Sequence, residues 1–143
     1  MANKDNPRKG RDFEKDAHRL FESQGIRLQR NFTVDIGVAT VRRPHKFDLG
    51  AIQPPLLVEC KSHTWTGGGN APAAKLSVWN EAMLYFLAAP ADYRKILFVL
   101  ESVRNGESLA HYYVRRYGHL IPEGVEIWEF SAETSTASEV PTK

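Results

Sequence analysis

A pair of prolines between two apolar stretches constrains the fold of this chain more than any other sequence feature. Residues 45–52 and 56–62 both have the composition of β-strands, and Pro54 and Pro55 lie between them. Proline has no amide hydrogen to donate and is excluded from the interior of a sheet ladder, so the prolines mark a turn. The sequence therefore predicts two strands joined by a short hairpin loop.

The second of these strands carries charged residues in an otherwise apolar segment. Side chains alternate between the two faces of a strand, so Glu59 and Lys61 share one face and Cys60 points to the other. If the hairpin loop has four residues, Asp48 on the first strand lies opposite Glu59, with Cβ atoms ~5 Å apart. A loop one residue longer or shorter would turn Asp48 to the other face unless a bulge corrected it. Unpaired buried charge is costly, so this grouping points to a function.

The rest of the chain alternates between helical and extended patterns. Gly25, Pro90 and Gly118 are natural helix ends, and Ser108 is a natural helix N-cap. The order is αβββαβ followed by an αβ extension, which predicts an α/β fold with a mixed central sheet flanked by helices. The expected helices are 9–25, 73–89 and 109–118, and the further strands are 31–38, 96–100 and 125–130.

A chain of 143 residues suits one domain. We expect this domain to cover residues 9–130. Residues 1–8 are predicted to be a flexible N-terminus. Residues 131–143 are small and polar and are predicted to be a disordered tail.

Composition excludes several classes of protein. Apolar residues make up 42% of the chain and charged residues 25%, as in a soluble globular protein. No apolar run approaches the ~20 residues of a membrane helix. The polar N-terminus lacks the apolar core of a signal peptide, and the single cysteine, Cys60, cannot form an intramolecular disulfide. We therefore expect a cytoplasmic protein without membrane contact.

The formal charge of +2 hides an asymmetry along the chain. Residues 1–63 carry 12 Lys/Arg against 8 Asp/Glu, whereas residues 64–143 carry 7 against 9. A basic patch is a feature of nucleic-acid binding, although a solvated surface has the same composition.

The charged residues of the hairpin suggest a metal site. Two carboxylates at the expected distance repel each other unless a cation lies between them. Carboxylate oxygens completed by waters are typical of Mg²⁺, for which Mn²⁺ can substitute. A lysine beside such a site can orient or deprotonate a water, or offset charge on a phosphate. Asp48, Glu59 and Lys61 therefore predict hydrolysis of a phosphate ester.

The pattern of Asp48 followed by Glu59-Cys60-Lys61 resembles the PD-(D/E)XK nuclease superfamily, which includes restriction endonucleases and Holliday-junction resolvases. Phe47 replaces the usual proline before the aspartate. The resemblance extends to the αβββαβ order and spans about residues 9–101, within a single nuclease-like domain. It implies an Mg²⁺-dependent DNA endonuclease of restriction-endonuclease-like fold, working as a homodimer.

The resemblance also assigns roles to residues. Asp48, Glu59, the carbonyl of Cys60 and the helix-borne Glu14 would bind the metal, and Lys61 would activate the water. Glu14 has an alternative role as an exposed acid favoured by the helix dipole. The expected DNA contacts are Lys9, Arg11, Arg42, Arg43, Lys46, Ser62 and His63.

Other readings remain open at this point. One is a non-catalytic DNA-binding module that keeps the nuclease fold, and another is a partner-binding protein in which Glu59 and Lys61 form only a charge pair. No helix-turn-helix or zinc finger is present to read a base sequence, which favours a structure-selective enzyme, with RNA a weaker alternative. Trp65 belongs either to a DNA-contacting loop or to a connector, whereas Tyr112 and its neighbouring tyrosines are expected to pack in the core.

Overall fold

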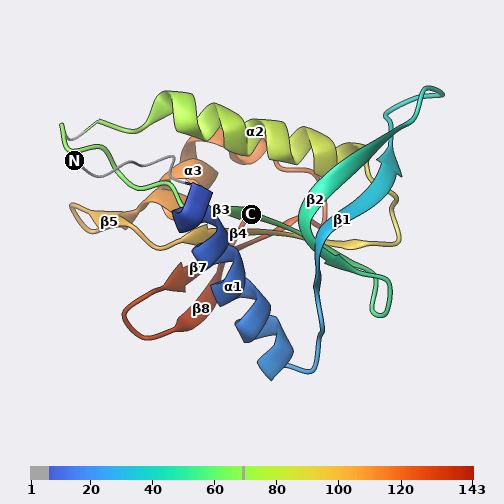
Figure 1. Cartoon of the computed structure of the whole chain (residues 1–143). Helices are drawn as coiled ribbons and strands as arrows, with labels where there is room; N and C mark the ends of the chain where they lie inside the picture. The colour runs from blue at the N-terminus through green and yellow to red at the C-terminus, as the bar shows by residue number, and fades with distance from the viewer. Residues whose placement is uncertain (1–6, 69) are drawn as a thin grey trace.

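A computed structural model describes residues 7–68 and 70–143, without the side chains of residues 7–9 and 11 (Figure 1). None of the described helices is long and apolar enough to cross a membrane. The helices are α1 (Pro7–Ser23), α2 (Ala73–Ala88), α3 (Leu109–Tyr117) and the short 3₁₀ helix η1 (Gly118–Leu120). The strands are β1 (Gln29–Ile36), β2 (Arg43–Ala51), β3 (Leu56–Lys61), β4 (Arg94–Leu100), β5 (Val103–Arg104), β6 (Glu107–Ser108), β7 (Glu126–Ser131) and β8 (Thr136–Val140).

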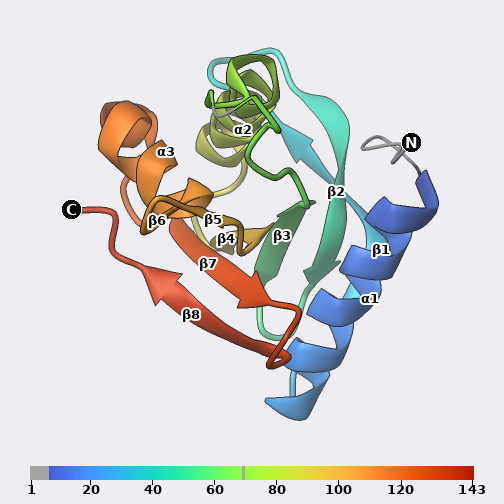
Figure 2. The same ribbon diagram turned by 90° about the vertical axis from the view of Figure 1, so that its left-hand side faces the viewer.

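Six of these strands form one mixed sheet in the order β1-β2-β3-β4-β7-β8. The central strands β3, β4 and β7 run parallel, and the outer neighbours pair antiparallel. Helix α1 covers one face of the sheet, whereas α2 and α3 cover the other (Figure 2). The predicted α/β class with a mixed sheet flanked by helices is therefore confirmed.

Each helical layer buries its own apolar cluster against the sheet. Fully burying one large apolar side chain stabilises the fold by roughly 1.5–3 kcal/mol, so the two clusters provide most of the driving force. On the α1 face the cluster includes Phe13, Ala17, Phe21, Leu49, Val58, Ile96, Phe98 and Phe130. On the other face it includes Phe47, Leu57, Leu76, Trp79, Met83, Phe86, Leu97, Val99, Leu109, Tyr113 and Ile127.

The predicted helix and strand ends are correct to within a few residues. Helix α2 ends just before Pro90, as expected. The Ser108 hydroxyl accepts a hydrogen bond from the amide of His111 at 3.1 Å, which confirms the predicted N-cap of α3. Strand β1 ends at Ile36, two residues before the predicted end, and Val38 is exposed in the loop that follows.

The prediction of a disordered tail from Ser131 is wrong. Residues Thr136–Val140 form strand β8, which extends the sheet beyond the predicted domain end at residue 130. The amides and carbonyls of β7 bond to β8 whatever its side chains are, so a polar segment can complete the sheet. Val140 also anchors the strand, because it is only 1% exposed and joins the α2–α3 cluster.

Two other differences concern the N-terminus and the segment before α3. Helix α1 already begins at Pro7, and the remainder of the predicted flexible N-terminus lies outside the described residues. The two-stranded hairpin of β5 and β6 was not predicted. Its turn contains Asn105 and Gly106, both with positive φ.

Gly50 is required by the close packing of β1 on β2. A Cβ atom at this position would lie 2.5 Å from the ring of Phe32. We expect Gly50→Ala to lower the free energy of unfolding by about 1–3 kcal/mol, measured by urea denaturation. Gly10→Ala is the control, because a Cβ on this helical glycine meets no atom within 4 Å. The control should be neutral or stabilising, and equal effects of the two substitutions would contradict the packing argument.

Candidate active site

The site begins where β2 and β3 stop pairing. Ala51 lies opposite Leu56, so the hairpin register is the predicted one. The ladder covers three residue pairs and ends just before Asp48 and Glu59 would meet. The backbone of the two strands therefore separates at these two acids.

An irregularity in β2 accounts for this separation. Phe47 belongs to the α2–α3 cluster and Leu49 to the α1 cluster, although residues two apart share a face in a regular strand. On the neighbouring strand, Asn31 adopts a positive φ of 54° and is passed over in the pairing of β1 with β2. The alternation of side chains along β2 is thus interrupted at Asp48. The carboxylate of this residue is turned toward β3, where it accepts from the Cys60 amide.

The two carboxylates replace backbone partners across the gap. The amide of Asp48 donates to Glu59 Oε1 at 3.0 Å, and the amide of Cys60 donates to Asp48 Oδ2 at 2.8 Å. Each acid is thereby held by the opposite strand. Asp48 Oδ1 and Glu59 Oε2 remain outside these two hydrogen bonds.

Lysine 61 completes the central group. Its Nζ atom lies 3.9 Å from Glu59 Oε2, and Lys61 is half-buried at the end of β3. Burial and the neighbouring charge of Asp48 together raise the pKa of Glu59 to about 8, although Lys61 opposes the shift. Burial also raises the pKa of Asp48, against the hydrogen bond from the Cys60 amide. Burial and mutual repulsion disfavour the charged forms of both acids. The pair is therefore stabilised either by a shared proton or by a bound cation.

The side chain and the backbone of Cys60 lie in different environments. Its side chain packs with the α1 cluster, on the face opposite Glu59, as the alternation along the strand predicts. Burial raises the pKa of its thiol well above the usual range, so this group does not serve as a thiolate. Only the backbone of Cys60 takes part in the site.

Glu14 lies on α1 and is held by an arginine. Its Oε1 atom is 3.1 Å from Arg30 Nη2, and its charge contributes to the raised pKa of Glu59. Within residues 7–68 and 70–143, no three His, Cys, Asp or Glu side chains group together to hold a metal ion. The expected metal set of three acids is therefore not assembled in this structure, since Glu14 is paired with Arg30.

A magnesium ion nevertheless fits the two remaining acids. Mg²⁺ keeps several waters and is commonly bound through one or two carboxylates. Asp48 and Glu59 provide carboxylates from adjoining strands, and burial raises the pKa of both. The donor set thus suits a hydrated divalent cation.

The expected DNA-binding residues are not gathered at this site. Arg42 and Arg43 are exposed at the far end of the β1–β2 hairpin, where they donate to the carbonyls of Asp35 and Arg42. Lys46 is exposed on β2, two residues before Asp48. The side chains of the other two, Lys9 and Arg11, lie outside the described residues.

The residues after Lys61 lead away from the carboxylates toward α2. Trp79 of α2 is fully buried, and its indole nitrogen donates to His63 Nδ1 at 2.9 Å. This bond fixes the tautomer with the proton on Nε2. Ser62 is half-buried between Lys61 and His63. The contact of Trp79 with His63 was not predictable from the sequence, because the two residues are 16 positions apart.

His45 was missed as a member of the site. Its ring stacks on Tyr85 at 3.9 Å between centroids and meets Phe47 edge-on at 4.6 Å. Burial lowers its pKa, while the charge of Asp48 raises it. Its place three residues before Asp48 was the only signal in the sequence, and the stacking partner comes from a distant helix.

No family model, curated protein or solved structure matches this chain. The fold defines an α/β protein with a six-stranded mixed sheet. Its candidate site consists of two buried carboxylates and a lysine on the separated ends of β2 and β3.

Proposed function

We propose that this protein is an Mg²⁺-dependent endonuclease that hydrolyses phosphodiester bonds of DNA. The observation that carries the proposal is the pair Asp48 and Glu59. These acids are buried together where two strands separate, and Lys61 Nζ lies 3.9 Å from Glu59. In a purely structural role, two neighbouring buried acids would have to share a proton or remain charged at a cost in stability.

The residues of the site have distinct roles in this proposal. Asp48, Glu59 and the carbonyl of Cys60 would hold Mg²⁺, with Mn²⁺ as a substitute, and Glu14 would take part only after leaving Arg30. The bound cation would lower the pKa of a water and offset negative charge on the phosphate. Lys61 would hold that water against the phosphorus, and only its neutral amine form could remove the proton of the water. The hydrogen bonds of Asp48 and Glu59 to the opposite strand orient both acids.

We also propose that the chain belongs to the PD-(D/E)XK superfamily. It is supported by the αβββαβ element order and by an Asp and a Glu-x-Lys on adjoining strands. Cleavage of both DNA strands calls for two active sites, so we propose a symmetric homodimer. Selection of a DNA structure over a base sequence is proposed because the sequence contains no helix-turn-helix or zinc finger.

The first experiment is a cleavage assay on supercoiled plasmid and on a four-way junction. We expect nicking or resolution with Mg²⁺ or Mn²⁺, none with EDTA, and loss of activity in Asp48→Asn. The matched control is Asp35→Asn, which alters an exposed aspartate on β1 and should retain full activity. Metal-independent binding without cleavage, unchanged in Asp48→Asn, would instead support a non-catalytic DNA-binding module.

A further inference from the structure

A second recess lies at the carboxyl ends of the sheet strands, apart from the carboxylates. It has a volume of about 270 Å³. Its wall is formed by Trp65, which follows β3, by Arg104 and Glu107 of the β5–β6 hairpin, and by Tyr112 and Arg115 of α3. Three separate segments thus converge on one small cavity.

Aromatic rings and guanidinium groups alternate in this wall. Trp65 and Tyr112 meet edge to face with centroids 5.1 Å apart. Arg104 lies over the Trp65 ring at 5.2 Å, and Arg115 lies over the Tyr112 ring at 5.1 Å. Tyr112 packs against the α2–α3 cluster as expected, and its half-buried ring also lines the recess.

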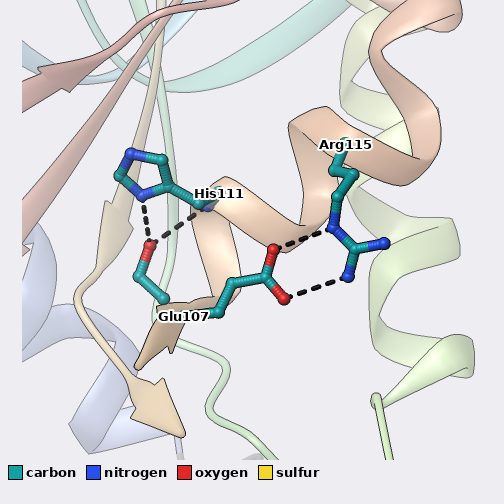
Figure 3. A network of polar contacts seen from close by, with 4 residues as sticks. Glu107, His111 and Arg115 are labelled. Carbon is teal, nitrogen blue, oxygen red and sulfur yellow. Dashed lines mark hydrogen bonds and ion pairs between the residues drawn. The ribbon is translucent and has the colours of Figure 1, made fainter. Parts of the chain in front are cut away.

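Polar contacts hold the wall in a defined shape (Figure 3). Both carboxylate oxygens of Glu107 accept from Arg115, at 2.9 and 3.0 Å. The amide of Trp65 donates to Ser102 Oγ at 3.1 Å, which ties the loop after β3 to the hairpin segment. The recess is therefore preorganised, which lowers the entropic cost of binding a ligand.

The positive charge of Arg104 is the group in the wall that a ligand can reach. The indole nitrogen of Trp65 has no hydrogen-bond acceptor in the described part of the chain, but it is buried. Among the ion pairs of residues 7–68 and 70–143, none includes Arg104, whereas Arg115 is neutralised by Glu107. The recess thus offers aromatic surface and the positive charge of Arg104.

We propose that this recess binds an unpaired nucleotide of a nucleic-acid strand, with the base against Trp65 and Tyr112 and a phosphate near Arg104. Aromatic and guanidinium planes are the surfaces on which proteins stack single-stranded bases. The volume lies just below the ~300–1,000 Å³ typical of sites for drug-sized ligands, which suits one flat ring. The inference rests on the proposed nuclease function for its choice of nucleic acid as ligand.

The position of the recess relates it to the candidate active site. Trp65 follows Lys61 by four residues, so their backbones are at most about 14 Å apart. Stacked nucleotides of one strand advance by about 3.4 Å each. A nucleotide held at Trp65 therefore lies within a few nucleotides of the carboxylates. The recess would direct cleavage to DNA with a single-stranded end, flap or branch.

Fluorescence anisotropy in EDTA tests the recess without cleavage. The probes are a labelled blunt duplex and the same duplex with a short single-stranded extension. We expect tighter binding of the extended duplex, and Trp65→Leu to weaken that binding by about 5- to 150-fold with little change for the blunt duplex. Trp65→Tyr should restore most of the preference.

The arginines provide a second test. Arg104→Gln should weaken binding of the extended duplex. The matched control is Arg116→Gln, which changes an exposed arginine of α3 outside the recess and should leave binding unchanged.

The outcomes separate this inference from the proposed function. Equal binding of both duplexes, or equal effects of Trp65→Leu on both, overturns the nucleotide recess even if the protein cleaves DNA in Mg²⁺. A preference that Trp65→Leu removes supports the recess even if no cleavage occurs. Failure to bind either probe overturns it. Circular dichroism and thermal unfolding of each variant establish that the fold is intact.

Discussion

Lys61→Ala is expected to lower metal-dependent cleavage by about 10²- to 10⁴-fold, the contribution usual for a positioned acid–base group. This corresponds to about 3–5 kcal/mol of transition-state stabilisation. The alanine removes the ammonium group that lies 3.9 Å from Glu59 and leaves both carboxylates in place. Cleavage rates under single-turnover conditions measure the effect without a contribution from product release.

Lys95→Ala is the matched control for this experiment. Lys95 is also a half-buried lysine of the same sheet, and its Nζ donates to the carbonyl of Ala89 at 3.4 Å. The control should cleave at close to the normal rate, even if it is somewhat less stable. Similar losses in both variants, or full activity of Lys61→Ala, would contradict a chemical role for Lys61.

The metal-free protein is expected to become less stable as the pH rises from about 5 to 8. Burial raises the pKa of Glu59 from 4.5 to about 8 in the folded protein. Between these values the folded protein binds more protons than the unfolded chain, so the free energy of unfolding falls with rising pH. The raised pKa of Asp48 acts in the same direction. Urea denaturation in EDTA across this range measures the slope.

Glu59→Gln should remove most of this slope and stabilise the metal-free protein at pH 8, by an amount of the order of a few kcal/mol. The amide oxygen of glutamine still accepts from the Asp48 amide, and no buried charge forms. Glu126→Gln is the control, because its pKa is lowered by hydrogen bonds from Arg94. The Glu126→Gln variant should be less stable than the wild type at neutral pH. Its free energy of unfolding should still fall between pH 5 and 8, as in the wild type. A wild-type profile in Glu59→Gln would contradict the raised pKa.

Magnesium should offset the same instability in the wild type. A cation bound by Asp48 and Glu59 in the folded state raises the midpoint of unfolding by mass action. We expect this effect to grow from pH 6 to pH 8, because the carboxylates must be deprotonated to bind it. Thermal unfolding with Mg²⁺ and with EDTA provides the comparison, and Glu59→Gln should show little response.

The local part of the site was predictable from the sequence. The prolines at 54 and 55 exclude a continuous strand, and the loop length then sets which residues face each other across the hairpin. The register of Ala51 opposite Leu56 is the one expected. Alternation along β3 likewise separated the side chain of Cys60 from those of Glu59 and Lys61.

Contacts between distant segments were not predictable in the same way. Arg30 pairs with Glu14, and Tyr85 stacks on His45, across 16 and 40 positions of sequence. No periodicity or spacing within one element encodes such partners. The polar strand β8 shows the same limit, since its pairing depends on the exposed edge of β7 and only weakly on its own side chains.

The sequence by itself determined the α/β class, the hairpin register and the two acids with their lysine, because turn residues and side-chain alternation act over a few positions. Only the tertiary structure decided that β2 and β3 separate at Asp48, that Arg30 holds Glu14, and that Trp65, Tyr112 and two arginines form one recess. These features depend on the packing of segments far apart in the chain. The burial that raises the pKa of Glu59 arises only when the helices close over the sheet.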